Sequence, residues 1–231
     1  MNLIKTCFII LVSLTIIAIT GDKVSAMNTR FITEETSETT ISRIHENFKI
    51  NPENDEEIKI PISCFDVSES GRIALGFNSD TKKYIYIYDQ QGNFDYGYKF
   101  EDDGVFGLEW DNDNIIIHLV RSDIAILIDS DAKILDIKTI SNNIENNSYW
   151  NHKIFTKKIN FENNTYKLIN GTNIFSSSPS GYKQLVKSDQ SGNEKIIYEA
   201  QGKTNYNILL LAIGAIIIIV MPLIVRKINK K

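Results

Sequence analysis

Apolar and polar residues alternate with a period of two through the middle of the chain, from Ile58 to Tyr198. Successive side chains of a β-strand point to opposite faces of its sheet, so this period predicts strands that bury one face. The clearest examples are the aromatic and β-branched run Tyr84–Tyr88 and the strictly alternating run Phe94–Phe100. The predicted strands are 58–62, 72–77, 84–88, 94–100, 107–110, 115–120, 124–128, 134–137, 153–161, 166–169, 182–186 and 195–198.

A four-residue turn with the form Asp-x-x-Gly or Asp-x-x-Ala follows the strand pattern at three places, 89–92, 129–132 and 189–192. The Asp carboxylate caps such a turn, and the Gly at its fourth position takes the left-handed conformation. Ala132 replaces this Gly in the second turn, so we expect the greatest backbone strain there. The turns are spaced by 40 and 60 residues, and the longer interval contains a polar loop at 141–148.

Hairpins that end in this turn before an apolar strand make residues 58–200 resemble the bacterial β-propeller repeats of the YVTN and NHL kind. The resemblance implies about three four-stranded antiparallel blades and a ligand-binding or scaffolding role, and it transfers no site residues. A β-sandwich or an open meandering sheet is the alternative fold, because any meander of hairpins uses such turns. Single-chain propellers have four blades or more. Three units leave an open face or edge, which invites self-association or a protein partner.

An uninterrupted apolar run without charge covers residues 208–225 near the end of the chain. As a helix it is ~27 Å long, which matches the core of a bilayer, so we predict a transmembrane helix over 206–225. The basic residues of 226–231 place this short tail in the cytoplasm by the positive-inside rule. The β domain is then extracellular, on a single-pass protein of the cell membrane.

The beginning of the chain has the three parts of a secretory signal peptide. Lys5 supplies the positive charge, residues 7–19 the apolar run, and Val24-Ser25-Ala26 the cleavage site. An uncleaved membrane helix is the alternative. The predicted organisation is a signal peptide at 1–26, a polar leader at 27–57 with one short strand or helical turn, the β domain at 58–205, the membrane helix at 206–225 and the tail at 226–231.

Charge and cysteine content narrow the class of partner and the compartment. Residues 27–205 contain 19 Lys and Arg against 28 Asp and Glu, a net charge of −9. Such a surface repels nucleic acid, so we expect no nucleic-acid partner. Cys7 leaves with the signal peptide, and Cys64 then has no partner for a disulfide. The abundance of Ile, Asn and Lys together with the lack of disulfides is typical of a Gram-positive bacterial surface.

Residues with catalytic or ligand-binding chemistry each have a structural explanation. Cys64 needs a His partner to act as a nucleophile, and buried apolar packing is the simpler role. His118 lies inside an apolar strand, while His45 and His152 are scattered. We therefore predict no catalytic, cofactor-binding or metal-ligating residues.

Acidic turns and aromatic side chains complete the candidates. The turns 111–114 and 129–131 offer oxygen ligands to calcium, but they lack the glycine and distal glutamate of an EF-hand, so turn capping is favoured. Aromatic side chains could stack on a sugar or peptide, although packing is expected in strands. They are Trp110, Trp150, Tyr84, Tyr86, Tyr88, Tyr96 and Tyr98.

Three functional hypotheses from different classes follow. The first is a non-enzymatic, membrane-anchored surface domain that binds a ligand or protein. The second is an accessory subunit of a membrane transporter or sensor complex. The third is a surface hydrolase, which the absence of HExxH, CxxC and GxSxG motifs disfavours.

Overall fold

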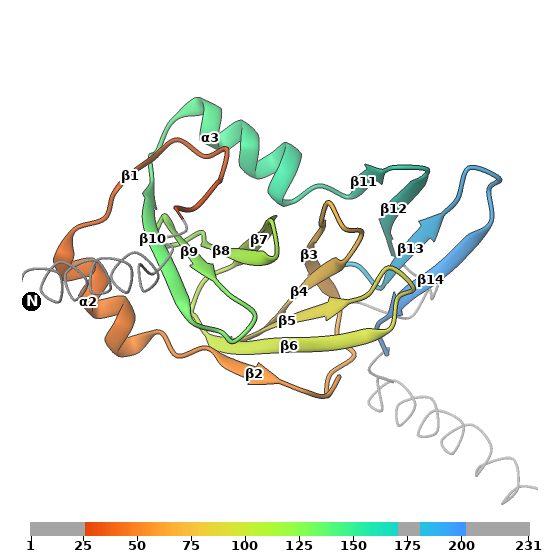
Figure 1. Ribbon diagram of the computed structural model, residues 1–231, viewed down its shortest axis with the longest axis horizontal. Helices are drawn as coiled ribbons and strands as arrows, with labels where there is room; N and C mark the ends of the chain where they lie inside the picture. The colour runs from red at the N-terminus through yellow and green to blue at the C-terminus, as the bar shows by residue number, and fades with distance from the viewer. Residues whose placement is uncertain (1–25, 171–180, 202–231) are drawn as a thin grey trace, which may run out of the picture.

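The computed structural model describes residues 26–170 and 181–201 (Figure 1). Except for Ala26, the predicted signal peptide lies outside these ranges, and so do the predicted membrane helix 206–225 and the tail 226–231. Among the described residues, no helix combines the length and the hydrophobicity needed to cross a bilayer.

Three antiparallel sheets form the fold, and each is built on a meander of four consecutive strands (Figure 1). The all-β prediction is therefore confirmed. The first sheet contains β3 (Ile62–Val67), β4 (Ile73–Ser79), β5 (Lys82–Tyr88) and β6 (Phe94–Glu101). The second contains β7 (Phe106–Asp111), β8 (Asn114–Leu119), β9 (Ile124–Ile128) and β10 (Ile134–Ile140). The third contains β11 (Lys158–Phe161), β12 (Asn164–Ile169), β13 (Gln184–Ser188) and β14 (Glu194–Glu199).

The leader adds a fifth strand to two of these sheets. Its elements are β1 (Thr33–Glu35), α2 (Glu38–Asn47) and β2 (Asn51–Glu53), which is more structure than the single strand or turn expected there. β1 pairs with the outer edge of β10, and β2 pairs with the outer edge of β6. Helix α2 begins where the Ser37 side chain accepts a hydrogen bond from the Thr40 N–H, and it buries Ile44.

The first sheet lies between the other two. One of its faces packs against the second sheet around Ile85, Phe100 and Ile117, and the other packs against the third sheet around Leu75, Tyr86 and Leu185. Strand β3 contacts both β7 and β11, so the first strands of the three meanders come together. The largest part of the apolar core is therefore in the two interfaces made by the first sheet.

Two segments cover the outer face of the second sheet, one that precedes this sheet in the sequence and one that follows it. One is α3 (Ile144–Tyr149) with the π-helix η1 (Trp150–Ile154), and the other is residues 27–31, which we call the N-terminal strap. The strap and the helices bury Phe31 and Ile154 over the strand residues Ile116 and Leu127.

Two predicted strands begin later than expected. The strand predicted at 153–161 starts at Lys158, because the preceding residues continue the helical crossover that begins at the Asn143 cap. The strand predicted at 58–62 starts only at Ile62, after Pro61, whose nitrogen cannot donate a ladder hydrogen bond.

The three Asp-x-x-Gly or Asp-x-x-Ala turns occupy equivalent positions, each between the third and fourth strand of its meander. In each turn the fourth residue donates its N–H to the carbonyl of the Asp. The predicted left-handed conformation is present at all three fourth positions, with φ of 81° at Gly92, 65° at Ala132 and 81° at Gly192. The turn repeat read from the sequence is therefore a structural repeat.

Candidate functional site

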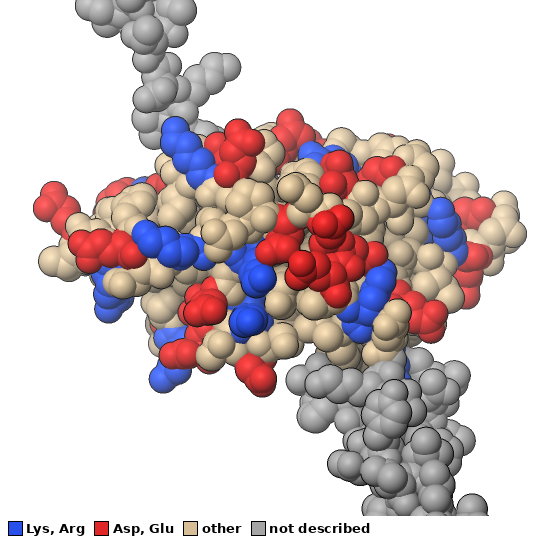
Figure 2. Space-filling view, turned by 90° about the horizontal axis from the view of Figure 1, so that it is seen from below, with Lys and Arg blue, Asp and Glu red and all other residues tan. Residues whose placement is uncertain are grey.

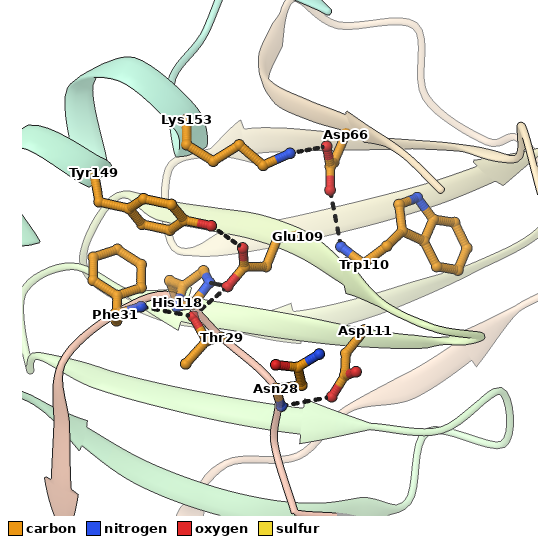
Figure 3. A network of polar contacts seen from close by, with 10 residues as sticks. All are labelled: Asn28, Thr29, Phe31, Asp66, Glu109, Trp110, Asp111, His118, Tyr149 and Lys153. Carbon is orange, nitrogen blue, oxygen red and sulfur yellow. Dashed lines mark hydrogen bonds and ion pairs between the residues drawn. The ribbon is translucent and has the colours of Figure 1, made fainter. Parts of the chain in front are cut away.

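Glu109 is the centre of a buried polar network on the outer face of the second sheet (Figure 3). One carboxylate oxygen, Oε1, accepts a hydrogen bond from Thr29 Oγ1 at 2.5 Å and contacts His118 Nε2 at 3.1 Å. The other, Oε2, accepts from the Tyr149 hydroxyl at 2.7 Å. These partners come from the strap, from β8 and from α3, so one carboxylate connects three parts of the chain.

The register of the second sheet explains why Glu109 and His118 meet. Glu109 in β7 faces Ile116 in β8, and His118 is two residues further along β8 on the same face. His118 is fully buried, and the rings of Phe31 and Trp150 pack around it with centroids 4.8 and 5.6 Å away. Its Nδ1 has no hydrogen-bond partner among the described residues.

The balance of burial and hydrogen bonding keeps Glu109 ionised. Burial raises the pKa of Glu109, but the hydrogen bond and charge interaction with His118 lower it. Hydrogen bonds from Thr29 and Tyr149 lower it further, so its pKa lies below the ordinary value of 4.5. Burial raises the pKa of Tyr149, and the hydrogen bond to the carboxylate raises it again, which keeps the phenol protonated as a donor.

A second carboxylate, Asp66 on β3, ties the first sheet to the helical crossover (Figure 3). Its Oδ1 accepts from Lys153 Nζ at 2.7 Å, and its Oδ2 accepts from the backbone N–H of Trp110 at 3.0 Å. Asp66 is only 4% exposed, so this ion pair is largely removed from water on one side. The bond to Trp110 also joins β3 to β7, which lie beside each other without forming one sheet.

The geometry of the network is that of a structural junction. Glu109 is 5% exposed and His118 is 0% exposed, so a substrate has no access to either group. The hydroxyls of Thr29 and Tyr149 both donate to Glu109 oxygens, and the Thr29 hydroxyl accepts from the Phe31 N–H. A nucleophilic hydroxyl would instead have to donate its hydrogen to the His118 ring. The network therefore holds the strap and α3 against the sheet.

The remaining residues considered from the sequence do not gather at one place. Cys64 is fully buried and burial raises the pKa of its thiol, which leaves it in the unreactive protonated form expected of a packing residue. His45 and His152 are exposed. Asp111 accepts from the Asn28 N–H of the strap, and Asp129 accepts from the Asp131 and Lys133 N–H groups of its own turn, so the carboxylates of both acidic turns are bonded within the protein.

The aromatic residues pack as the strand positions predicted. Tyr84, Tyr86, Tyr88 and Tyr98 are buried in the core. Tyr96 and Trp110 are half-buried, and the Arg72 guanidinium lies over both rings, 5.4 and 5.2 Å from their centroids. Within residues 26–170 and 181–201, no three His, Cys, Asp or Glu side chains form a group that could hold a metal ion.

A polar cavity of about 360 Å3 lies between the turn 89–92 of the first sheet and the turn 189–192 of the third. Two lysines at its wall donate to backbone carbonyls of the first turn, Lys187 to Gln90 and Lys195 to Gln91. The ammonium groups of these lysines are therefore already hydrogen-bonded, and none of the residues that line the cavity is a buried ionisable group. The lining residues are Gln90, Gln91, Asn164, Lys187, Asp189, Asn193, Glu194 and Lys195.

The surface in Figure 2 is seen from the side on which β2 lies in Figure 1. Acidic side chains gather near the middle of this face, and basic side chains are placed around them. The acidic stretch after β2 is bonded to the rest of the protein through Glu56, which accepts a hydrogen bond from the Tyr88 hydroxyl and forms an ion pair with Lys59. This face is unsuited to polyanions such as nucleic acid.

The grouping of Glu109, Thr29 and Tyr149 was not predicted from the sequence. The available signal was a charged residue inside the apolar strand Gly107–Trp110, where an unpaired carboxylate would be costly. Its partners are far away in the sequence, 80 residues for Thr29 and 40 for Tyr149, so no local pattern connects them.

Comparison with models of protein families, with curated proteins and with solved structures gave no match to this chain. The fold and the network thus define the chain only as an all-β protein of three antiparallel sheets with an internal ionic junction.

Proposed function

We propose that this protein is a membrane-anchored, extracellular binding module without enzymatic activity, and that its third sheet binds a protein partner. Its three meanders correspond to propeller-like blades of the kind that the turn repeat suggests. The apolar run 208–225 supplies the anchor, and the signal peptide exports the domain.

The proposal rests on a difference in pairing at the outer edge of the fourth strand of each meander. The outer edge of β6 is paired with β2 and the outer edge of β10 is paired with β1, but no described strand pairs with the outer edge of β14. An unpaired edge presents backbone N–H and C=O groups that an added strand satisfies. Next to this edge, Ile196 is 50% exposed, which adds apolar area to the same surface.

Further support comes from the ionisable groups of the interior. Glu109, His118 and Asp66 hold elements of the fold together, and the cavity beside β14 has a polar wall whose lysines are bonded to backbone carbonyls. These features favour recognition through a surface over chemistry in a pocket.

Site-specific photo-crosslinking in cells that naturally make the protein tests this proposal. A photoreactive residue placed at Ile196 is expected to give a cross-linked product of defined mass. The matched control is Ile144, which is 84% exposed on α3 and lies far from β14 in the fold. Products from position 196 alone support the proposal, and mass spectrometry separates a second copy of this chain from a subunit of a transporter or sensor.

Equal products from positions 196 and 144, or none from either, would contradict binding at the third sheet. The anchor is tested in the same cells, because the cross-linked and free chains should both stay in the membrane fraction after a carbonate wash. Release by the wash would remove the membrane anchor from the proposal.

A further inference from the structure

The N-terminal strap crosses the outer face of the second sheet and bonds to carboxylates as it does so. Glu109 on β7 and Asp136 on β10 are the two ends of one row across this face, with Ile116 and Leu127 between them. Each of the first three strap residues donates to a different carboxylate. The bonds are Met27 N–H to Asp136 Oδ2 at 3.0 Å, Asn28 N–H to Asp111 Oδ2 at 2.9 Å and Thr29 Oγ1 to Glu109 Oε1 at 2.5 Å.

The first residue held by the sheet is also the first residue after the predicted cleavage site. Met27 is half-buried and packs against the apolar cluster of Phe31 and Leu127. Ala26, directly before it, is exposed. The Ala26–Met27 bond therefore joins an exposed residue to the first residue that is held by the sheet.

Asp136 forms no ion pair with a basic side chain of the described residues. Its two hydrogen-bond donors are the backbone N–H groups of Met27 and Ile137. Within the described residues no Lys, Arg or His nitrogen lies within 4.0 Å of its carboxylate, and Lys138, which interacts with it at longer range, is paired with Glu35. Asp111 also accepts only from amide groups, those of Asn28 and the Asn112 side chain.

We propose that Asp136 is the receptor for the new N-terminus that signal-peptide cleavage creates at Met27. In this hydrolysis a water molecule is consumed and the C–N bond between Ala26 and Met27 breaks. The hydroxyl goes to the carbonyl carbon of Ala26, and the hydrogen goes to the nitrogen of Met27. An α-amine with a pKa of about 7.7–8.0 is mostly protonated at neutral pH, so the neutral donor beside Asp136 becomes an ammonium.

Cleavage thus changes a hydrogen bond between a neutral amide and a carboxylate into an ion pair between an ammonium and a carboxylate. The opposite charge beside Asp136 favours the charged form of both groups. The added positive charge also offsets the carboxylates of Asp136, Asp111 and Glu109. Basic groups in this region are His118, which contacts Glu109, Lys138, which interacts with Asp136, and Arg30, which interacts with Tyr149. Processing fastens the strap, with Phe31, to the outer face of the second sheet, so the processed chain is more stable than its precursor.

The experiment uses the full chain, expressed with its own signal peptide, inserted in bacterial membranes and purified in detergent. Mass spectrometry is expected to find Met27 as the first residue. The rate of acylation of the Met27 α-amine as a function of pH gives its pKa, which should lie about 1 unit or more above the reference value because a carboxylate faces the ammonium. In Asp136→Asn the pKa should return to about 7.7–8.0.

Two controls separate this ion pair from general effects. Asp131→Asn makes the same charge change on an exposed turn and should leave the amine pKa at the wild-type value. Insertion of two alanines between Ala26 and Met27 displaces the ammonium while it keeps the Met27 N–H. The insertion should lower the melting temperature of the wild-type chain and should have no further effect in the Asp136→Asn chain.

An N-terminus at any residue other than Met27 would overturn the proposal. So would an amine pKa that is the same in the wild type and in Asp136→Asn, or an insertion that destabilises both chains equally. The inference rests on the signal peptide of the proposed function, but its outcome does not depend on a partner at β14. A failure here and a failure of the cross-linking test can therefore be told apart.

Discussion

The second and third sheets share a four-stranded meander and the same turn before the last strand, but they are covered differently. The second sheet is buried on both faces, by the first sheet on one side and by the strap and helical crossover on the other. The third sheet packs on the first sheet through one face, and its opposite face carries Lys167 and Ile196, both exposed. The pattern of apolar and polar residues along the strands differs between the two sheets in the same way.

Strands with two covered faces have continuous apolar runs. All five residues of β9, Ile124–Ile128, are buried, and β8 is buried from Ile115 to Leu119. In the third sheet, β12 alternates between buried Tyr166 and Leu168 and exposed Lys167. An apolar run without alternation therefore indicates a strand that is covered on both faces, whereas alternation indicates a strand with one exposed face.

The largest difference in stability between the two sheets should come from removing the Glu109 junction of the second sheet. Glu109→Ala leaves His118, Thr29 and Tyr149 without their acceptor in a buried site, and it should cost about 3–5 kcal/mol of unfolding free energy. Denaturant unfolding followed by tryptophan fluorescence measures this loss. Glu194→Ala on the exposed face of β14 is the control and should change stability by less than about 0.5 kcal/mol.

The pH dependence of stability gives a second readout of the same junction, through the variant Glu109→Gln. Because its folded pKa is lowered, the ionised carboxylate stabilises the fold above the unfolded value of 4.5, and this contribution is lost as the pH falls through the folded pKa. Glu109→Gln should therefore lose less stability than the wild type below pH 4.5. Identical acid profiles for the two proteins would contradict an ionised Glu109 in the fold.

A smaller effect should come from trimming an apolar side chain on the outer face of each sheet. Leu127→Ala removes a fully buried side chain under the strap and should cost about 2–5 kcal/mol. Ile196→Ala on the corresponding side of the third sheet should cost less than about 0.5 kcal/mol in the free protein. A similar loss at both positions would mean that the outer face of the third sheet is covered in the intact chain.

The smallest effects should distinguish the turns of the three meanders. Gly92→Val and Gly192→Val each place a β-branched residue at positive φ and should cost about 1–2 kcal/mol. The loss should be larger at Gly92, where an added Cβ would lie 2.8 Å from Ile197 Cδ1, whereas at Gly192 no described atom lies within 4 Å of it.

Ala132→Gly should be neutral or slightly stabilising, because Ala132 already has a positive φ of 65°. Thermal melts of the three variants check this order. If Ala132→Gly were the most damaging of them, the three turns would not be equivalent.

The strands and turns of the three meanders were predictable because their signals are local. Alternation placed β5, β6 and β9 at or close to their final positions, and the Asp at the start of each turn marked where the third strand ends. The helical crossover was missed because Lys153 and Ile154 fit an alternating pattern equally well, while the Asn143 cap that starts the helix is hidden in an Asn-rich segment.

The strap and the junction depend on pairings that sequence patterns do not report. β1 and β2 have only three residues each, too few for a periodic signal, and they form because the outer edges of β10 and β6 are available. Glu109 looked like an isolated charge because Thr29 and Tyr149 reach it only after the sheet has formed. Contacts between residues so far apart in the sequence are set by strand register and packing and not by local composition.

The pairing of the leader with late strands also affects the order in which the chain folds. Ile32 bonds to Asn146, which is 114 residues later in the chain, so the leader is among the last segments to find its contacts. The first sheet can form its meander from neighbouring residues while the leader is still unpaired, since closing a long loop is slow. Under the export that we propose, the leader would stay open to proteases until β10 emerges, and a chaperone that shields it would raise the yield of folded protein.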